Sequence, residues 1–288
     1  MWKEYTITYK SVNDYENQVD YAYWQFLIIP LVNETQKLTG LDFTNSLHAI
    51  NQFSINGFGF QTIKVHPNKK FKNIAFEATF VVHKSDRSLP KKSGFNEVES
   101  SFQEFNSLNF KINFEQFLRT TSLTNLRVQK NGIFRFEENI GILENLKNLN
   151  HWIHLHLSYL PGVTDTATTL DKVLKQRSGV CQDFAHLFCA ISRENGVPCR
   201  YVSGYLNHES GYLGDSQMHA WVEAFAPGFG WIGFDPTNDI LTNINHIKVC
   251  HGKDYNDCSP LKGIIISQGN HKTSHSVVVK NQQRQIQQ

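Results

Sequence analysis

The sequence has no long hydrophobic run, no surplus of charge of one sign and few cysteines. Its longest apolar run, residues 26–32, is far shorter than the roughly 20 residues that a membrane-spanning helix needs. The amino terminus carries no basic segment followed by an apolar one, so we expect no secretory signal and a soluble, cytoplasmic protein. The 28 Lys and Arg residues against 26 Asp and Glu leave a formal charge of +2, which gives no basis for a nucleic-acid or membrane partner.

The five cysteines are too few, and odd in number, for a disulfide framework in a chain of 288 residues. No C-x-x-C pair occurs, which argues against a zinc ribbon and a thioredoxin-like motif. Cys250 and Cys258 could pair under oxidising conditions, although we expect free thiols. His151, His154 and His156 share one predicted helix, but no third ligand is evident nearby and no EF-hand loop is present. We therefore expect neither a metal ion nor a cofactor.

The chain is long enough for two domains, or for one large domain with an appendage, and 40% of its residues are apolar. Residues 5–9, 61–66 and 74–82 alternate or are rich in β-branched and aromatic side chains, which predicts an antiparallel sheet or small sandwich. From residue 141 onwards, helical spacing and further strands predict an α+β core. We expect four segments: a β-rich amino-terminal domain over 1–85, a linker and mixed, partly helical segment over 86–140, the core over 141–280 and a flexible tail over 281–288.

The core is predicted to open with two amphipathic helices. The first has apolar side chains at steps of three and four residues, namely Ile142, Leu146, Leu149, Ile153 and Leu157. Pro161 and Gly162 end this helix. Thr168 or Thr169 can cap the second helix, whose apolar face begins at Leu170.

The segment over residues 178–200 places a cysteine at the start of a helix. Its apolar side chains follow helical spacing, and Gly196 and Pro198 end the pattern, so the helix is predicted to begin at about Cys181. Unsatisfied N–H groups and the positive end of the helix dipole stabilise a thiolate at such a position. The alternative is that Cys181 is a small buried hydrophobic residue, as free cysteines commonly are, and position alone does not decide between the two. Cys189 and Cys199 have no activating feature and are predicted to be structural.

A predicted hairpin follows, with strands over 217–225 and 231–235 joined by a turn at 227–230. If Phe225 pairs with Trp231, then His219 and Asp235 fall on the same face as diagonal neighbours, whereas a four-residue loop would put them on opposite faces. A thiol, an imidazole and a carboxylate are the three groups of an acyl-transfer site, because the imidazole takes the thiol proton and the carboxylate orients the imidazole.

Four further residues are weaker candidates for contact with a substrate or an oxyanion. Gln182 and Asp183 would support the start of the helix, and either could also reach a substrate. Asp215 lies in a loop just before the histidine strand, and Trp221 flanks the predicted site, where it could shield it from water or simply pack across strands. The backbone N–H of Cys181 is the candidate for one oxyanion donor.

These same stretches resemble a known family. They read RSGVCQDFAHLF around Cys181, CRYVSGY in the next strand and HAWVEAFAPGFGWIGFDPTND across the hairpin. They are similar to the bacterial transglutaminase-like superfamily, whose fold is related to that of papain-like cysteine peptidases. The similarity covers about residues 145–275, and the amino-terminal strands look like the β domain that often precedes this core in bacterial members.

The resemblance implies a nucleophile helix packed on an antiparallel sheet. It implies Cys181 as nucleophile, His219 as general base and Asp235 as the orienting acid. The calcium sites of animal transglutaminases have no counterpart in the sequence.

Three functions remain open at this point. The first is a cysteine peptidase or amidase that hydrolyses peptide or isopeptide amides through a thioester intermediate. The second is a transglutaminase that transfers a glutamine acyl group to an amine. The third is a binding or scaffold protein without turnover. The expected partner is a peptide or protein substrate, and the sequence does not indicate an oligomeric state.

Overall fold

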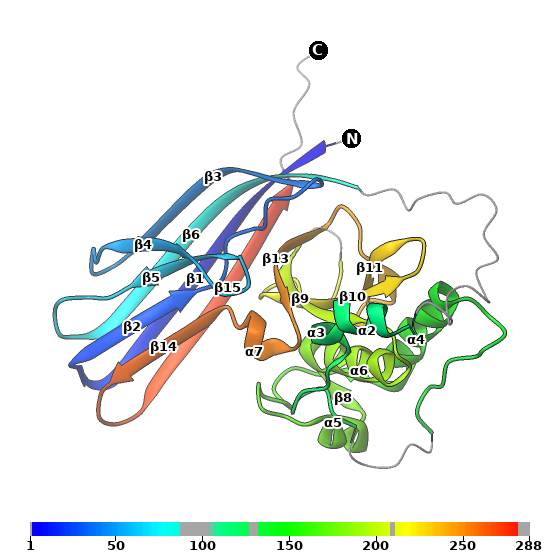
Figure 1. The fold of residues 1–288 in the computed structure, drawn as a ribbon. Helices are drawn as coiled ribbons and strands as arrows, with labels where there is room; N and C mark the ends of the chain where they lie inside the picture. Colours follow the sequence, from blue (N-terminus) through cyan, green and yellow to red (C-terminus); the bar gives the residue numbers. More distant parts are fainter. Residues whose placement is uncertain (1, 87–104, 106, 127–131, 208–210, 282–288) are drawn as a thin grey trace.

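The computed structural model describes residues 2–86, 105, 107–126, 132–207 and 211–281. These residues form a β-rich part and an α+β core, which lie side by side in Figure 1. Residues 282–288 of the predicted tail and residues 87–104, 106 and 127–131 of the predicted linker segment lie outside the described residues.

The β-rich part consists of two four-stranded antiparallel sheets. The first has the order β15 (His271–Asn281), β1 (Trp2–Val19), β6 (Phe71–Ser85) and β3 (Gln36–Asn45). The second has the order β14 (Leu261–Ile266), β2 (Tyr21–Phe26), β5 (Gln61–Val65) and β4 (Asn51–Ile55).

Alternating burial along β1 shows how this part holds together. Tyr5, Ile7 and Tyr9 are buried while their neighbours are more exposed, so one face of the strand is covered. The Tyr5 hydroxyl on this face donates to Oδ1 of Asn245 in the core at 3.3 Å. The ring of Phe76 from the first sheet contacts that of Phe26 from the second, with centroids 4.7 Å apart. The predicted sandwich is therefore present, with an aromatic core.

Strands β14 and β15 come from the carboxyl-terminal end of the chain, although the sequence analysis assigned residues 261–280 to the core. They pair with β2 and β1, about 240 and 260 residues earlier in the chain. Backbone pairing can join segments at any sequence separation, and each of these strands completes the edge of a sheet. The core of the structure thus ends near residue 260.

The core is built on a five-stranded antiparallel sheet. Its order is β12 (Ile240–Leu241), β11 (Gly230–Asp235), β10 (His219–Ala226), β9 (Cys199–Leu206) and β13 (His246–Gly252). Helix α6 (Cys181–Glu194) packs on this sheet, with the ring of Phe188 5.3 Å from that of Phe234.

The remaining elements surround this sheet and helix. They are α2 (Leu108–Asn113), α3 (Glu115–Leu118), α4 (Ile142–His156), α5 (Leu170–Gln176), α7 (Tyr255–Cys258) and the short parallel pair β7 (Ser158–Tyr159) and β8 (Ser178–Gly179). Helix α4 buries Ile142, Leu146, Leu149 and Ile153, and α5 follows Thr169 as its capping residue. Both predicted helices are present, although α4 ends at His156, before Pro161, and the side chain of Thr169 makes no capping hydrogen bond.

Buried hydrogen bonds join the two parts. The side-chain amide of Gln36 in β3 accepts from the backbone N–H of Lys248 at 2.7 Å and donates to the carbonyl of the same residue at 2.9 Å. The hydroxyl of Tyr205 donates to the carbonyl of Ile28 at 2.6 Å. Because buried polar groups are costly when unpaired, these bonds fix the β-rich part against β9 and β13.

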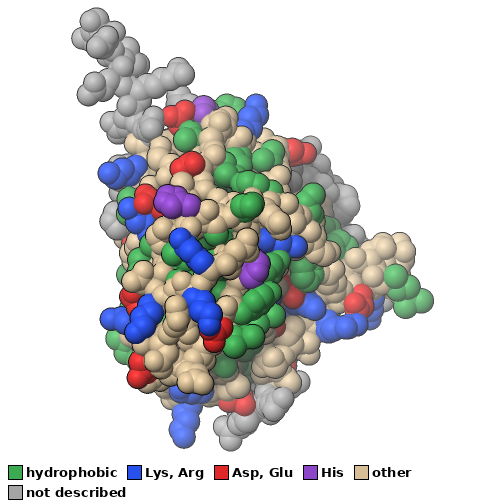
Figure 2. Space-filling view, turned by 90° about the vertical axis from the view of Figure 1, so that its left-hand side faces the viewer, with side chains coloured by type: hydrophobic (Ala, Val, Ile, Leu, Met, Phe, Trp, Pro, Cys, Tyr) green, Lys and Arg blue, Asp and Glu red, His purple; other side chains and the backbone are tan. Residues whose placement is uncertain are grey.

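The surface of the β-rich part carries mixed side chains. Figure 2 shows lysines and arginines, acidic residues and hydrophobic side chains interspersed on the face that it presents. Within the described residues, no helix is both long and apolar enough to cross a membrane.

Candidate active site

Cys181 is the first residue of α6, as the sequence predicted. Val180 before it is extended, with φ −114° and ψ 177°, and its N–H donates to Asp183 Oδ2 at 2.8 Å. The same oxygen accepts from the hydroxyl of Thr164 at 2.7 Å. A Cβ on Gly179 would lie 2.5 Å from this oxygen, so the close approach of the chain to the carboxylate requires glycine. These contacts fix the turn that presents the thiol.

Cys181 is also the only one of the five cysteines that is not buried. It lines a cleft of about 720 Å³, together with His219. The other four thiols lie in the interior, and the Sγ atoms of Cys189 and Cys199 are 3.6 Å apart. The distribution of exposure therefore singles out Cys181 as the thiol that a solute can reach.

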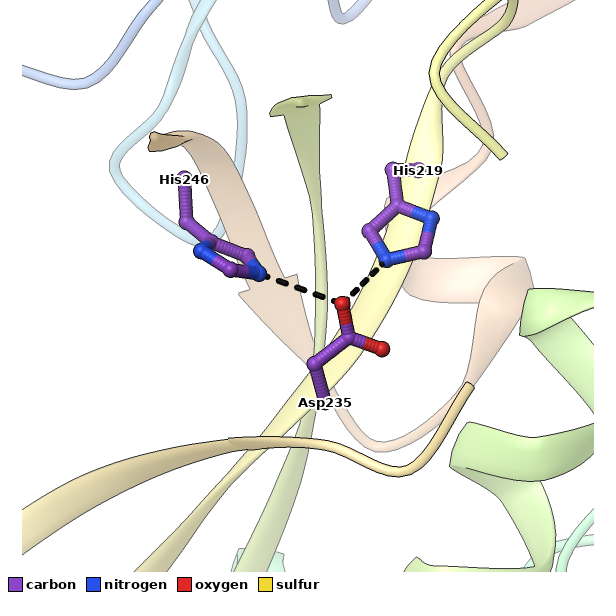
Figure 3. Close-up of side chains that lie close together, drawn as sticks. All are labelled: His219, Asp235 and His246. Carbon is purple, nitrogen blue, oxygen red and sulfur yellow. Dashed lines mark hydrogen bonds and ion pairs between the residues drawn. The ribbon is translucent and has the colours of Figure 1, made fainter. Parts of the chain in front are cut away.

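The hairpin of β10 and β11 brings His219 and Asp235 together. Phe225 pairs with Trp231 and Ala226 with Gly230, which leaves a three-residue turn and confirms the register on which the sequence argument depended. His219 Nε2 donates to Asp235 Oδ2 at 2.8 Å (Figure 3), and both side chains are fully buried.

The Asp235 carboxylate is held by five donors. Oδ2 accepts from His219, from Nε2 of His246 at 3.1 Å and from Nδ2 of Asn238 at 2.8 Å. Oδ1 accepts from the backbone N–H groups of Thr237 and Asn238. Burial alone would raise the pKa of Asp235, but the two imidazoles hold it well below its usual range. The group is therefore a fixed anion.

His219 is positioned to be a cation beside this anion. Burial acts to lower the pKa of His219, but the Asp235 carboxylate and the nearby Cys181 thiol outweigh it and raise the pKa to about 10. Its Nδ1 atom is buried and has no hydrogen-bond partner among the described residues. Because Nε2 is committed to Asp235, Nδ1 is the nitrogen left to exchange a proton with the thiol.

A glycine allows the loop before β10 to pass over this nitrogen. Gly214 has φ +85°, and a Cβ there would lie 2.7 Å from His219 Nδ1 and 3.6 Å from the hydroxyl of Tyr159. Any larger residue would press on the imidazole, so the loop covers Nδ1 closely only because residue 214 is glycine.

His246 was not identified from the sequence. It lies on β13, which pairs with β9 and not with β11, so no local register relates it to Asp235. Burial lowers the pKa of His246, which keeps this imidazole neutral. The motif HIKVCHG was the available signal, but it carried no indication of a partner.

His219, Asp235 and His246 lie close enough together to ligate a metal ion. Their hydrogen bonds account for this proximity without one, since both Nε2 atoms donate to the same carboxylate oxygen (Figure 3). A metal ligand must offer a lone pair at that nitrogen instead. The observed arrangement fits a hydrogen-bonded cluster.

The weaker candidates lie in different places. Gln182 lines the cleft beside Cys181, and its Nε2 donates to the carbonyl of Asp165 at 3.4 Å. Asp183 is buried behind the start of α6, where it holds Val180. Gly214 and Ser216 line the cleft, but Asp215 between them is not among the lining residues, although its charge acts on Tyr159.

Trp221 is buried beside His219. Its ring contacts those of His219 and His246, with centroids 6.2 and 5.3 Å away, and it does not line the cleft. Gly204 on the neighbouring strand makes room for it, because a Cβ there would lie 2.5 Å from the indole. Trp221 therefore packs against both imidazoles and helps to hold them in place.

Comparison with protein families finds a match for the part of the chain that holds the predicted catalytic residues. Residues 133–236, which include Cys181, His219 and Asp235, match the model of the transglutaminase-like superfamily. This part of the chain is therefore similar to the transglutaminase-like superfamily, and the predicted resemblance and α+β fold class are confirmed.

The curated relatives are bacterial. An uncharacterised protein of Mycobacterium leprae is 38% identical over 173 residues, which cover 58% of this chain and 60% of that protein. A protein-glutamine gamma-glutamyltransferase of Pseudomonas aeruginosa is 36% identical over 86 residues, which cover 28% of this chain and 13% of that protein. The chain therefore spans less than two thirds of the length of either relative.

A solved structure matches almost the whole fold. The crystal structure of a candidate cysteine protease from Cytophaga hutchinsonii aligns with a TM-score of 0.67, at 17% sequence identity. The alignment covers 99% of this chain and 93% of that one. The β-rich part and the core thus occur together in a second protein.

Proposed function

We propose that the transglutaminase-like part of the chain is a thiol-dependent acyl-transfer enzyme that acts on amide bonds of a peptide or protein. In this proposal Cys181 is the nucleophile, His219 the general base and Asp235 the residue that orients the base. The observation that carries it is the 2.8 Å hydrogen bond from His219 Nε2 to Asp235 Oδ2, which leaves Nδ1 free beside the half-buried thiol at the start of α6.

The first half-reaction forms a thioester. In the resting pair the thiol proton already lies on His219 Nδ1, and the Cys181 thiolate attacks the amide carbon. The carbonyl oxygen becomes an oxyanion, for which the backbone N–H of Cys181 is the proposed donor. The C–N bond then breaks, and His219 returns the proton to the departing amine.

The second half-reaction releases the acyl group. Water attacks the thioester carbon while His219 takes one of its protons, the C–S bond breaks, and the resting pair of Cys181 and His219 is restored. The net change is the hydrolysis of an amide to an acid and an amine. A primary amine in place of water would give a new amide, which is the transferase alternative.

The transferase alternative has one specific observation in its favour. The Pseudomonas aeruginosa relative, whose similarity is confined to 86 residues, is named as a protein-glutamine gamma-glutamyltransferase. The cleft of this chain is open enough, at about 720 Å³, for either water or an amine to follow the departing group.

Product analysis separates the three functions. A blocked glutaminyl peptide and unfolded casein are incubated with the protein, with and without a primary amine, and the products are identified by mass spectrometry. Hydrolysis gives acid in both reactions, whereas transfer gives the amine adduct. Cys181→Ala should abolish both, and Cys189→Ala, the same change at a buried thiol of the same helix, should not. Absence of any product and of any acylated Cys181 would favour a binding protein.

A further inference from the structure

Apart from Cys181 and His219, the cleft that holds the proposed nucleophile has no formally charged side chain in its wall. Its lining in the described part of the chain contains no Asp, Glu, Lys or Arg. Apart from Cys181 and His219, its polar side chains are hydroxyls, amides and one more imidazole, His275. Burial lowers the pKa of His275, which keeps that ring neutral near pH 7. A charged side chain of a ligand would lose its hydration here without gaining an ionic partner.

The β-rich part supplies one wall of this cleft. Tyr9 of β1 and Thr273, His275 and Val277 of β15 line it opposite the residues of the core. The Tyr9 hydroxyl lies 3.1 Å from His275 Nδ1. The backbone N–H of Val277 donates to the carbonyl of Ser216, just before β10, at 3.0 Å. This wall is therefore fixed relative to His219.

Strand β15 presents a free edge along this wall. Within the residues that the structure describes, it is the outermost strand of its sheet and pairs only with β1, in an unbroken register over residues 271–281. The N–H of Val277 points away from β1, because it bonds to Ser216. The backbone groups of a strand alternate in direction, so those of Thr273 and His275 point the same way as those of Val277. No backbone hydrogen bond is made on that side by either residue within the described part of the chain.

We propose that an extended polypeptide with uncharged side chains binds along the free edge of β15 as an added strand, with its reactive carbonyl at Cys181. The edge offers backbone donors and acceptors at every second residue, as in other complexes in which a peptide extends a sheet. The uncharged cleft beside it selects the side chains. This inference rests on the proposed function for the position of the reactive carbonyl.

The test uses peptide chloromethyl ketones as probes. Cys181 attacks the methylene carbon, a C–S bond forms and chloride leaves, so labelling is read by mass spectrometry. A blocked neutral tetrapeptide probe is compared with versions that are N-methylated at each amide in turn, and with versions that carry Asp or Lys. Each rate is divided by the rate of iodoacetamide, which needs no peptide subsite.

We expect N-methylation at alternate amides to slow labelling about tenfold and at the intervening amides to have little effect, because only alternate amides can face the edge. Asp or Lys in the probe should also slow labelling about tenfold. Equal rates for all N-methylated probes would overturn the proposal.

A pair of variants tests the edge itself. Thr273→Pro removes the N–H that faces the cleft, and proline is tolerated at such a position of an edge strand. Thr273→Val keeps that N–H but removes the same hydroxyl, which donates to Asn13 at 2.9 Å. Only the proline variant should slow the peptide probe, with the iodoacetamide rate unchanged in both. If the proline variant does not fold, the N-methylated series decides.

Failure of the proposed function gives a different result. If Cys181 is no more reactive to iodoacetamide than a free thiol, the catalytic proposal fails. The edge is then tested alone in the Cys181→Ser variant. A fluorescently labelled amide of the same neutral tetrapeptide is titrated with this variant, and N-methylation at alternate amides must weaken its binding. Binding that does not depend on which amides are methylated would contradict the proposal for the β15 edge. Pairing of two copies of the chain at β15 would contradict it as well.

Discussion

At the scale of single residues, Asp235 is the centre of the site. Five donors surround its two oxygens, and two of them are imidazoles. A carboxylate that is held so firmly cannot rotate away, so it fixes both the direction and the tautomer of His219. The rest of the proposed chemistry depends on that orientation.

Replacement of the carboxylate by an amide should therefore be severe. Asp235→Asn keeps the size of the side chain but removes the charge that stabilises an imidazolium. We expect kcat/KM for amide cleavage to fall by about 10² to 10⁴-fold, as measured with a fluorogenic peptide amide.

Asp239→Asn is the matched control for this change. Asp239 lies four residues further on, bonds to His151 and has φ +53°, a conformation that asparagine tolerates. The Asp239→Asn variant should leave kcat/KM for amide cleavage nearly unchanged. Equal losses of kcat/KM in the two variants would show that activity depends on negative charge near the site and not on the hydrogen bond between Asp235 and His219.

The positions of Cys181, His219 and Asp235 could be predicted from the sequence because these residues lie on local elements. The spacing of apolar residues placed Cys181 at a helix start, and one pairing, Phe225 with Trp231, related His219 to Asp235. His246 could not be predicted, because its contact with Asp235 joins strands that are neither consecutive nor neighbours in the sheet.

At the scale of elements, the start of α6 determines where the thiol lies. The Asp183 carboxylate accepts from Val180 and Thr164, so it joins the helix to the preceding loop. Gly179 leaves the space that this carboxylate fills. The first turn of α6 is thus held by side chains as well as by its backbone.

Loss of this carboxylate should loosen the turn. Asp183→Ala should lower the free energy of unfolding by about 1–2 kcal/mol, the usual cost of losing a helix-capping side chain, measured by urea denaturation. Glu194→Ala, at the exposed end of the same helix, should change it by less than about 0.5 kcal/mol. An effect of Glu194→Ala as large as that of Asp183→Ala would contradict the capping role.

The helices of the core were predictable because their periodicity is local, whereas the place of β14 and β15 was not. The sequence of β15 is polar at most positions, and only Val277 and Val279 are buried. Its partner strand lies at the other end of the chain. No pattern within the segment can indicate a partner so distant.

At the scale of the whole molecule, buried titratable groups set the pH range of stability. Burial lowers the pKa of His186 and of His251 to about 3. The free energy that these neutral rings contribute is present above the unfolded value near 6.5 and is lost as pH falls towards 3. His219 acts in the opposite direction, because its pKa is raised to about 10, so its contribution is present below about 6.5 and is lost as pH rises through 10.

The protein should therefore be most stable near neutral pH. Urea unfolding between pH 4 and pH 10 should give a free energy of unfolding that falls on both sides of neutral pH. On the acid side, the slope of this free energy against pH reports the protons taken up on unfolding, and His186→Gln should reduce that uptake by about one proton. An acid side equally steep in the variant would show that His186 is not buried in the neutral form.

The cleft itself belongs to the whole molecule and could not be predicted. It forms where β1 and β15 meet the core, and the buried amide of Gln36 helps to hold these parts together. The sequence indicated the β-rich part and the core separately, but no pattern in it indicated how the two parts pack against each other.

The central claim is that Cys181 and His219 act as a thiolate–imidazolium pair. The most direct measurement is the pH dependence of iodoacetamide alkylation at Cys181, in the protein and in His219→Ala, with a short cysteine peptide as reference. The account predicts that Cys181 reacts at pH 6 at least about tenfold faster than the free thiol, whose pKa is near 8.5, and that His219→Ala removes this advantage. A reaction no faster than that of the peptide, or a rate unaffected by the loss of His219, would contradict it.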